Sequence, residues 1–239
     1  MWVGHYQMLE GMYGKHPIRN RIAGTAETVA EITEETLQRA YACYYTTDEM
    51  ALICAGDIPL GEVRRMAERV ARRETDAHVY FPTEDAEIAE KYRACEMRLS
   101  VPQFQIGCKL PPLPKQDWLK KRMAAGFCME LLAGESSVFF QKAYEWDWLD
   151  EALGSAFFCG EGYAFAAFSG SGTHPEETAD FLGRELERLQ REGFSQEDFQ
   201  RIRKKHLGQL LRQLDTPQKL CFGQLAWARM DATAIDLLT

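Results

Sequence analysis

Apolar and polar positions recur along this chain with two different periods, which predict both helices and strands. Apolar residues spaced three and four apart lie on one face of a helix. This spacing is found over 2–13, 33–44, 59–70 and 117–133, and in the segments that begin at Pro175 and Ser195. The expected inner faces are Leu37, Ala40, Tyr41 and Tyr44; Val63, Met66 and Val70; Leu119, Met123, Phe127 and Leu131; and Ala179, Leu182, Leu186 and Leu189.

Local stop and start signals support these helices. Thr33 precedes two glutamates and suits an N-cap, and Gly134 offers a C-terminal cap. Asp198 follows Ser195 by three residues, a weaker relative of the capping box.

Strands are expected where the period falls to two or where a short apolar run meets a stop signal. An apolar run ending in Gly-Asp predicts a buried strand over 49–57, and alternation predicts strands over 95–100 and 103–110. Two further strands are expected to turn at Gly160-Glu161-Gly162. This mixture indicates the α+β class, with one antiparallel or mixed sheet and helices packed on one face.

Composition narrows the possible partners. The 239 residues carry a net charge of −8, which argues against nucleic-acid or anionic-membrane binding. No apolar run approaches the ~20 residues that span a bilayer, and a cytoplasmic location is expected. The scattered cysteines are expected to be reduced, buried thiols: Cys43, Cys54, Cys95, Cys108, Cys128, Cys159 and Cys221.

A zinc hydrolase site needs imidazoles at helical spacing, with a carboxylate to activate water. The histidines are His5, His16, His78, His174 and His206, and none lies four residues from another. His206 falls on an apolar helical stripe and is interpreted as an ordinary packed or edge histidine. The two glutamates after His174-Pro175 suit a helix N-terminus without any metal.

Nucleophilic sites are equally incomplete. "GESS" at 134–137 and "SGSG" at 169–172 lack the strand-turn-helix context of a serine nucleophile and suit caps or turns. "GSGTH" lacks the spacing and lysine of a phosphate loop. No catalytic, cofactor-binding or metal-binding residue is therefore assigned to this chain.

The order of several motifs resembles the insulinase/pitrilysin-like zinc metallopeptidases. "HPIRNRIAGTAETVAEITEETLQRAYACYYTTDEMALICAGDI" follows that family from its His-Pro to its Gly-Asp. "LLAGESSVFFQKAY" and "SGTHPEETADFLGRELERL" resemble later parts, so the likeness covers nearly the whole chain. "GMYGKHPIRNRIAGT" and "YEWDWLDEALGSAFF" are similar to bacterial processing-protease-like paralogues linked to modification of elongation factor P.

The resemblance implies an inactive-type domain, from the first half of such an enzyme, with the LuxS/insulinase-like fold. Zinc and its ligands would then belong to a segment upstream. Residues 1–24 would be a trailing helix and connector from that segment, 25–215 the main domain, and 216–239 a C-terminal helix or linker. An Arg and a Tyr that bind peptide in some relatives are not matched between Tyr144 and Glu151.

The leading hypothesis is a non-catalytic domain that helps form the peptide-binding chamber of a larger zinc endopeptidase. This chain alone is expected to be inactive. Its expected partners are a peptide or small protein substrate and the rest of its own chain, and a paralogous subunit is a further candidate. An extended peptide could pair with the edge of the strand at 103–110. The alternative is a scaffold module of a catalytically dead paralogue; a free-standing thiol enzyme is a third reading.

Overall fold

The structure is a computed structural model that describes residues 2–47, 50–70, 80–82, 84, 87–233 and 236. It contains two compact units. We call Met1–Asn20 with Phe81–Leu207 the sheet unit, and Arg21–Tyr80 with Gly208–Thr239 the helical unit. The boundaries expected from the sequence concern how the chain relates to a longer protein and stay a prediction.

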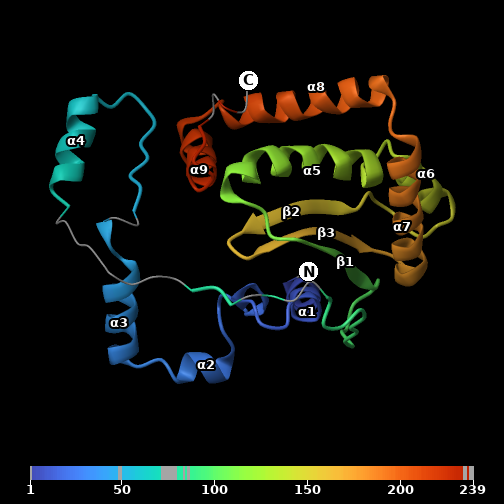
Figure 1. The fold of residues 1–239 in the computed structure, drawn as a ribbon, viewed down its shortest axis with the longest axis horizontal. Helices are drawn as coiled ribbons and strands as arrows, with labels where there is room; N and C mark the ends of the chain where they lie inside the picture. Colours follow the sequence, from blue (N-terminus) through green and yellow to red (C-terminus); the bar gives the residue numbers. More distant parts are fainter. Residues whose placement is uncertain are drawn as a thin grey trace. The chain divides into compact units, whose positions relative to one another are not determined.

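A three-stranded antiparallel sheet forms the centre of the sheet unit (Figure 1). Its strands are β1 (Gln103–Leu110), β2 (Gly154–Gly160) and β3 (Tyr163–Ser171), in the order β1-β3-β2. The β2–β3 hairpin turns at Glu161-Gly162, where Gly162 has a φ of 78° that a side chain would strain. The predicted strand at 103–110 and the predicted hairpin are both confirmed.

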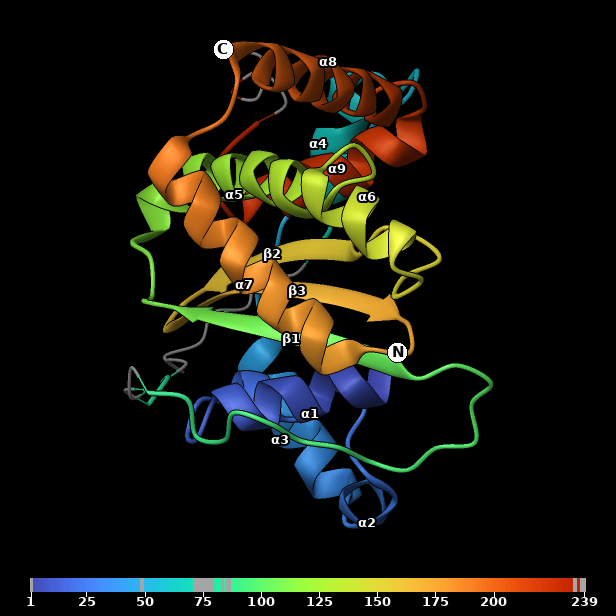
Figure 2. The same ribbon diagram turned by 90° about the vertical axis from the view of Figure 1, so that its right-hand side faces the viewer.

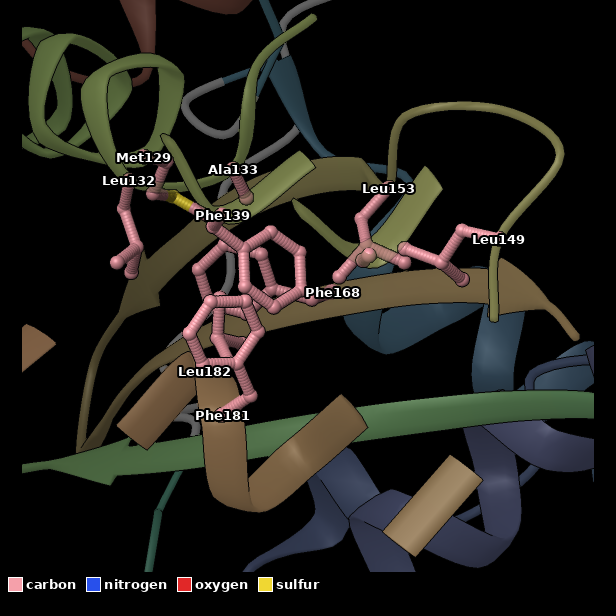
Figure 3. Packing of buried hydrophobic residues seen from close by; sticks show 10 residues of the cluster. Met129, Leu132, Ala133, Phe139, Leu149, Leu153, Phe168, Phe181 and Leu182 are labelled. Carbon is pink, nitrogen blue, oxygen red and sulfur yellow. The ribbon is translucent and has the colours of Figure 1, made fainter. Parts of the chain in front are cut away.

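One face of the sheet is covered by α5 (Trp118–Ala133), α6 (Val138–Glu145) and α7 (Pro175–Glu192) (Figure 2). Phe168 of β3 points into this layer and meets side chains from all three helices (Figure 3). The buried members of this main core are Met129, Leu132, Ala133, Phe139, Ala143, Leu149, Leu153, Phe168, Phe181 and Leu182. The predicted α+β class with helices over the sheet is confirmed.

The opposite face of the sheet is covered by α1 (Trp2–Met12). Because side chains alternate along a strand, Phe165 and Ala167 of β3 point away from the main core and pack against Leu9, Met12 and Tyr13. Leu9, Met12 and Tyr13 are themselves buried. The predicted helix over 2–13 therefore forms the second core of the sheet unit.

Short polar motifs end and begin the helices of the main layer. Gly134 closes α5, and the Ser137 hydroxyl accepts the Phe140 N–H to cap α6. Ser195 caps α8 (Gln196–Gln213) by accepting the Asp198 N–H, as predicted. By length and composition 115–145 could cross a membrane, but it is broken at 134–137 and its longer helix packs against β2.

The buried faces of two helices differ from those predicted. In α7 the buried residues are Thr178, Phe181, Leu182 and Glu185, whereas Leu186 is exposed. In α5 the buried residues are Trp118, Met129, Leu132 and Ala133, whereas Met123 is exposed. Because an α-helix has 3.6 residues per turn, residues spaced strictly four apart move gradually around the helix and leave its buried face. Phe127 of α5 instead packs on α8, against Phe199 and His206.

The helical unit contains α2 (Ala26–Ala30), α3 (Glu34–Tyr44), α4 (Leu60–Glu68) and α9 (Pro217–Ala228). Single-turn helices lie outside it at Pro17–Arg19 and Lys115–Asp117. The boundary between the two units falls inside α8, after Leu207. Thr33 caps α3 as predicted, through a capping box with Thr36. A similar box between Thr25 and Thr28 begins α2, which the sequence did not predict.

Four predictions for the more exposed segments are wrong. The expected inner face of α4 lies largely on the surface, with Met66 51% and Val70 57% exposed. The expected inner face of α3 lies on the surface, with Leu37 60% and Tyr44 64% exposed. Residues 50–57 and 95–100 form no strand, although the sequence predicts strands over 49–57 and 95–100. A strand exists only where a neighbour takes up its backbone hydrogen bonds, and in the described residues these two segments have no such neighbour.

Phe139→Ala is expected to lower the free energy of unfolding by about 3–5 kcal/mol. The ring is fully buried between α5 and α7, and its removal leaves a cavity. Phe194→Ala, which removes a ring that is 52% exposed, is the matched control and should cost less than about 1 kcal/mol. Urea unfolding followed by tryptophan fluorescence measures both. Equal losses in the two variants would contradict this packing.

Candidate functional site

The described histidines lie apart and contact aromatic rings. His206 stacks on Phe127 with ring centroids 4.6 Å apart, and His174 stacks on Trp148 at 5.7 Å. His5 lies near Phe158 and Phe165, and His16 stacks on Phe81. His78 lies outside the described residues. No group of three potential metal ligands occurs in the described part of the chain.

Three of the four serines considered as nucleophiles stabilise local structure. Ser137 caps α6, and Ser136 accepts a hydrogen bond from the Arg201 guanidinium of α8. The Ser169 hydroxyl donates to the Gly154 carbonyl across the β2–β3 pair, at 3.3 Å. Each of these hydroxyls therefore has a structural partner in place of a general base.

The seven cysteines are free thiols, but none is fully buried, so the expectation of buried thiols is wrong. Cys54 and Cys95 lie in segments that form no strand, and Cys128 faces away from the main core on α5. Burial raises the pKa of the Cys108, Cys128 and Cys159 thiols. A raised pKa lowers the thiolate fraction and makes these three poorer nucleophiles at neutral pH.

A buried ion pair joins Glu84, which lies on the segment before β1, to Lys109 of β1. The Lys109 ammonium lies 3.3 Å from Oε1 of Glu84, and the two side chains are only 7% and 5% exposed. Lys109 also donates to the carbonyls of Met12, at 2.8 Å, and Glu87, at 2.9 Å. Its ammonium lies 4.8 Å from the centre of the Tyr13 ring. The lysine is thus surrounded by oxygen acceptors and an aromatic face.

Three consecutive backbone N–H groups complete the surroundings of Glu84. Gly14 donates to Oε1 at 2.9 Å, and Lys15 and His16 donate to Oε2 at 2.9 and 2.7 Å. Successive N–H groups that converge in this way form an anion-binding concavity. We call these three N–H groups together with the Lys109 ammonium the carboxylate cradle.

The cradle changes the protonation of its carboxylate. Burial alone would raise the pKa of Glu84, but the backbone N–H groups of 14–16 and the Lys109 ammonium outweigh it. Together they lower that pKa from 4.5 to about 2. Glu84 is therefore ionised throughout the physiological pH range.

His16 connects the cradle to the β2–β3 hairpin. Its Nδ1 accepts the Ile18 N–H at 3.1 Å, so the ring proton is on Nε2, which donates to the Glu161 carbonyl at 2.9 Å. Pro17 opens the single-turn helix that follows, where no N–H is required. A side chain at Gly162 would come within 3.0 Å of Nε2. The His-Pro pair therefore has a structural role in this domain.

The sequence did not identify Glu84 or Lys109. Glu84 is one acid among several between 74 and 90, and Lys109 occupies a polar position of a half-buried strand. The one available signal was that Lys109 is the only charged residue between 103 and 110.

The outer edge of β1 is the second feature of the site. β1 ends the sheet and pairs only with β3 among the strands of the described residues. Both faces of β1 are covered: Phe104, Ile106 and Cys108 pack on the main core. On the other face, a Cβ at Gly107 would lie 2.7–2.9 Å from side-chain atoms of Met8 and Met12. A new partner could therefore add to β1 only along its edge.

The fold and these contacts define an α+β domain in which the described histidines and Ser136, Ser137 and Ser169 have structural partners. Residues 31–205 match the family described as the peptidase M16 inactive domain. The chain belongs to this family, and its predicted membership of the insulinase/pitrilysin-like metallopeptidases is confirmed.

Individual relatives agree with this assignment. The chain is 26% identical over 245 residues to the uncharacterized zinc protease YmfH of Bacillus subtilis, covering all of this chain and 57% of that protein. An M16-like peptidase from Alicyclobacillus acidocaldarius has the same fold, with a TM-score of 0.86 and 24% sequence identity. The match covers 98% of this chain and 56% of the chain of that peptidase.

The peptidase M16 inactive domain from Pseudomonas fluorescens has a TM-score of 0.76 and 16% identity, over 98% of this chain and 56% of its own. This chain thus spans little more than half the length of these relatives.

The stability supplied by Glu84 is expected to depend on pH in a defined window. Because the pKa is about 2 in the folded chain and 4.5 ordinarily, this stability is fully present above about pH 5 and is lost as the pH falls toward 2. Glu84→Gln should cost on the order of 3 kcal/mol at pH 7, and the difference from the wild type should shrink between pH 5 and pH 3.

Urea unfolding at several pH values measures this difference. Glu87→Gln, which changes an exposed carboxylate three residues away, is the control and should show little difference at any pH. A cost for Glu84→Gln that is independent of pH would contradict the role of its charge.

Proposed function

We propose that this domain helps to shape the peptide-binding chamber of a larger zinc endopeptidase and supplies no hydrolytic group itself. Membership of the M16 inactive-domain family and the length of the zinc-protease relative support the idea of a larger protein. Zinc would be held by a part of that protein outside this chain. The link to elongation factor P and the cytoplasmic location stay predictions.

The observation that carries the peptide-binding part is the outer edge of β1. A peptide that adds a strand to a sheet is held by backbone hydrogen bonds, so its extension matters more than its sequence. Since both faces of β1 are already packed, the sheet is rigid where the peptide would add. The net charge of −8 favours a peptide that carries positive charge.

Zinc analysis and a peptidase assay on the full-length gene product, beside this chain, test the proposal as a whole. Zinc and chelator-sensitive cleavage are expected only in the longer protein, because hydrolysis needs several ligands on one ion. Stoichiometric zinc or cleavage by this chain alone would overturn the proposal. A full-length protein without zinc or activity would favour the scaffold alternative.

Amide hydrogen exchange of this chain, with and without an extended peptide of alternating Lys and Val, tests the edge. Exchange is expected to slow over 104–108 and to stay unchanged over 155–159, because β2 is the opposite edge of the same sheet. The control peptide has Pro in place of alternate Val residues and cannot donate the same hydrogen bonds. Equal protection of β1 and β2, or no loss of protection with the Pro peptide, would contradict pairing at β1.

A further inference from the structure

The carboxylate cradle has the composition of a binding site, although a side chain of the same protein fills it. Four donors converge on two oxygens of Glu84: three N–H groups of 14–16 and the Lys109 ammonium. Three of the four belong to the backbone, and none belongs to the segment that carries Glu84. The donors therefore stay in the protein when the Glu84 side chain is removed.

Contacts that do not involve Glu84 hold the donors in place. The Tyr13 hydroxyl donates to the Ala164 carbonyl at 3.0 Å, which joins the end of α1 to β3. The His16 ring accepts a hydrogen bond from the Ile18 N–H and donates one to the Glu161 carbonyl. The Lys109 ammonium donates to the Met12 carbonyl. The turn at 14–16 is thus fixed from α1, from the hairpin and from β1.

Glu84 reaches the cradle from a segment that is distant in the sequence, 68–70 residues from the turn. We call the described residues between 81 and 90, which are 81, 82, 84 and 87–90, the strap. Besides Glu84, three groups of the strap contact the rest of the sheet unit: the Phe81 ring stacks on His16, the Glu87 carbonyl accepts from Lys109, and the Glu90 N–H donates to the Gly11 carbonyl. These contacts keep the carboxylate near its donors, which raises its effective concentration.

We propose that the cradle is a binding site for a single carboxylate group, with Glu84 as its built-in ligand, and that a small free carboxylate takes the same place when Glu84 is absent. Two oxygens are needed, because the N–H groups of Lys15 and His16 meet one oxygen while Gly14 and Lys109 meet the other. A spherical anion of the same charge cannot satisfy both sets at once. In the intact chain the tethered side chain excludes external anions.

Chemical rescue of Glu84→Ala tests this site. The midpoint and free energy of urea unfolding are measured in sodium acetate and in sodium chloride at equal ionic strength. The variant is expected to be less stable than the wild type in chloride. Acetate at ten times its dissociation constant should raise the folding equilibrium constant of the variant about tenfold over chloride. The wild type should not respond to the exchange of anions.

Two controls separate the cradle from general effects of acetate. Glu87→Ala removes an exposed carboxylate of the same strap and should behave as the wild type in both salts. The double variant Glu84→Ala with Lys109→Met also lacks the ammonium. Acetate should therefore raise the stability of this double variant little or not at all. An equal response to acetate in all variants, or none in Glu84→Ala, would overturn the proposal.

If Glu84→Ala does not stay folded in chloride, its refolding yield reports whether acetate binds the cradle. Refolding from urea should recover more soluble protein in acetate than in chloride for this variant alone. Equal yields in the two salts would count against the site.

Discussion

The fold of the sheet unit depends on the central strand, β3, being buried on both of its faces. Its side chains alternate between two cores: Phe168 enters the main core under α5, α6 and α7, and Phe165 and Ala167 enter the core under α1. A strand in this position also needs a partner on each edge, and β1 and β2 supply them. The helices and both outer strands are thus arranged around the requirements of one nine-residue segment.

The carboxylate cradle joins parts of the chain that the sheet alone does not connect. The turn after α1, the strap and β1 meet at one buried ion pair, and His16 extends the connection to the β2–β3 hairpin. A buried ion pair stabilises a protein only when its desolvation is offset by further hydrogen bonds. Here three backbone N–H groups and two carbonyls provide them. The His-Pro motif, which carried much of the family resemblance, is part of this arrangement.

Features with local causes could be predicted from the sequence. The helix caps at Thr33 and Ser195 need only a hydroxyl that accepts the backbone N–H of the residue three positions later in the chain. The β2–β3 hairpin follows from two apolar stretches that flank Gly160-Glu161-Gly162, and the positive φ of Gly162 fits that turn. The strands expected over 49–57 and 95–100 depend on a partner elsewhere in the chain, which periodicity cannot reveal. Glu84 and Lys109 are 25 residues apart, and neither has a local pattern that predicts their contact.

The packing of α1 on β1 depends on the missing side chain of Gly107, over which two methionines lie. This feature makes the N-terminal helix an integral layer of the domain, whatever larger protein it belongs to. A chain shortened past this helix, by a protease or by design, would leave Phe165 and Ala167 facing water. Such a product would expose a sheet surface of the kind that promotes self-association.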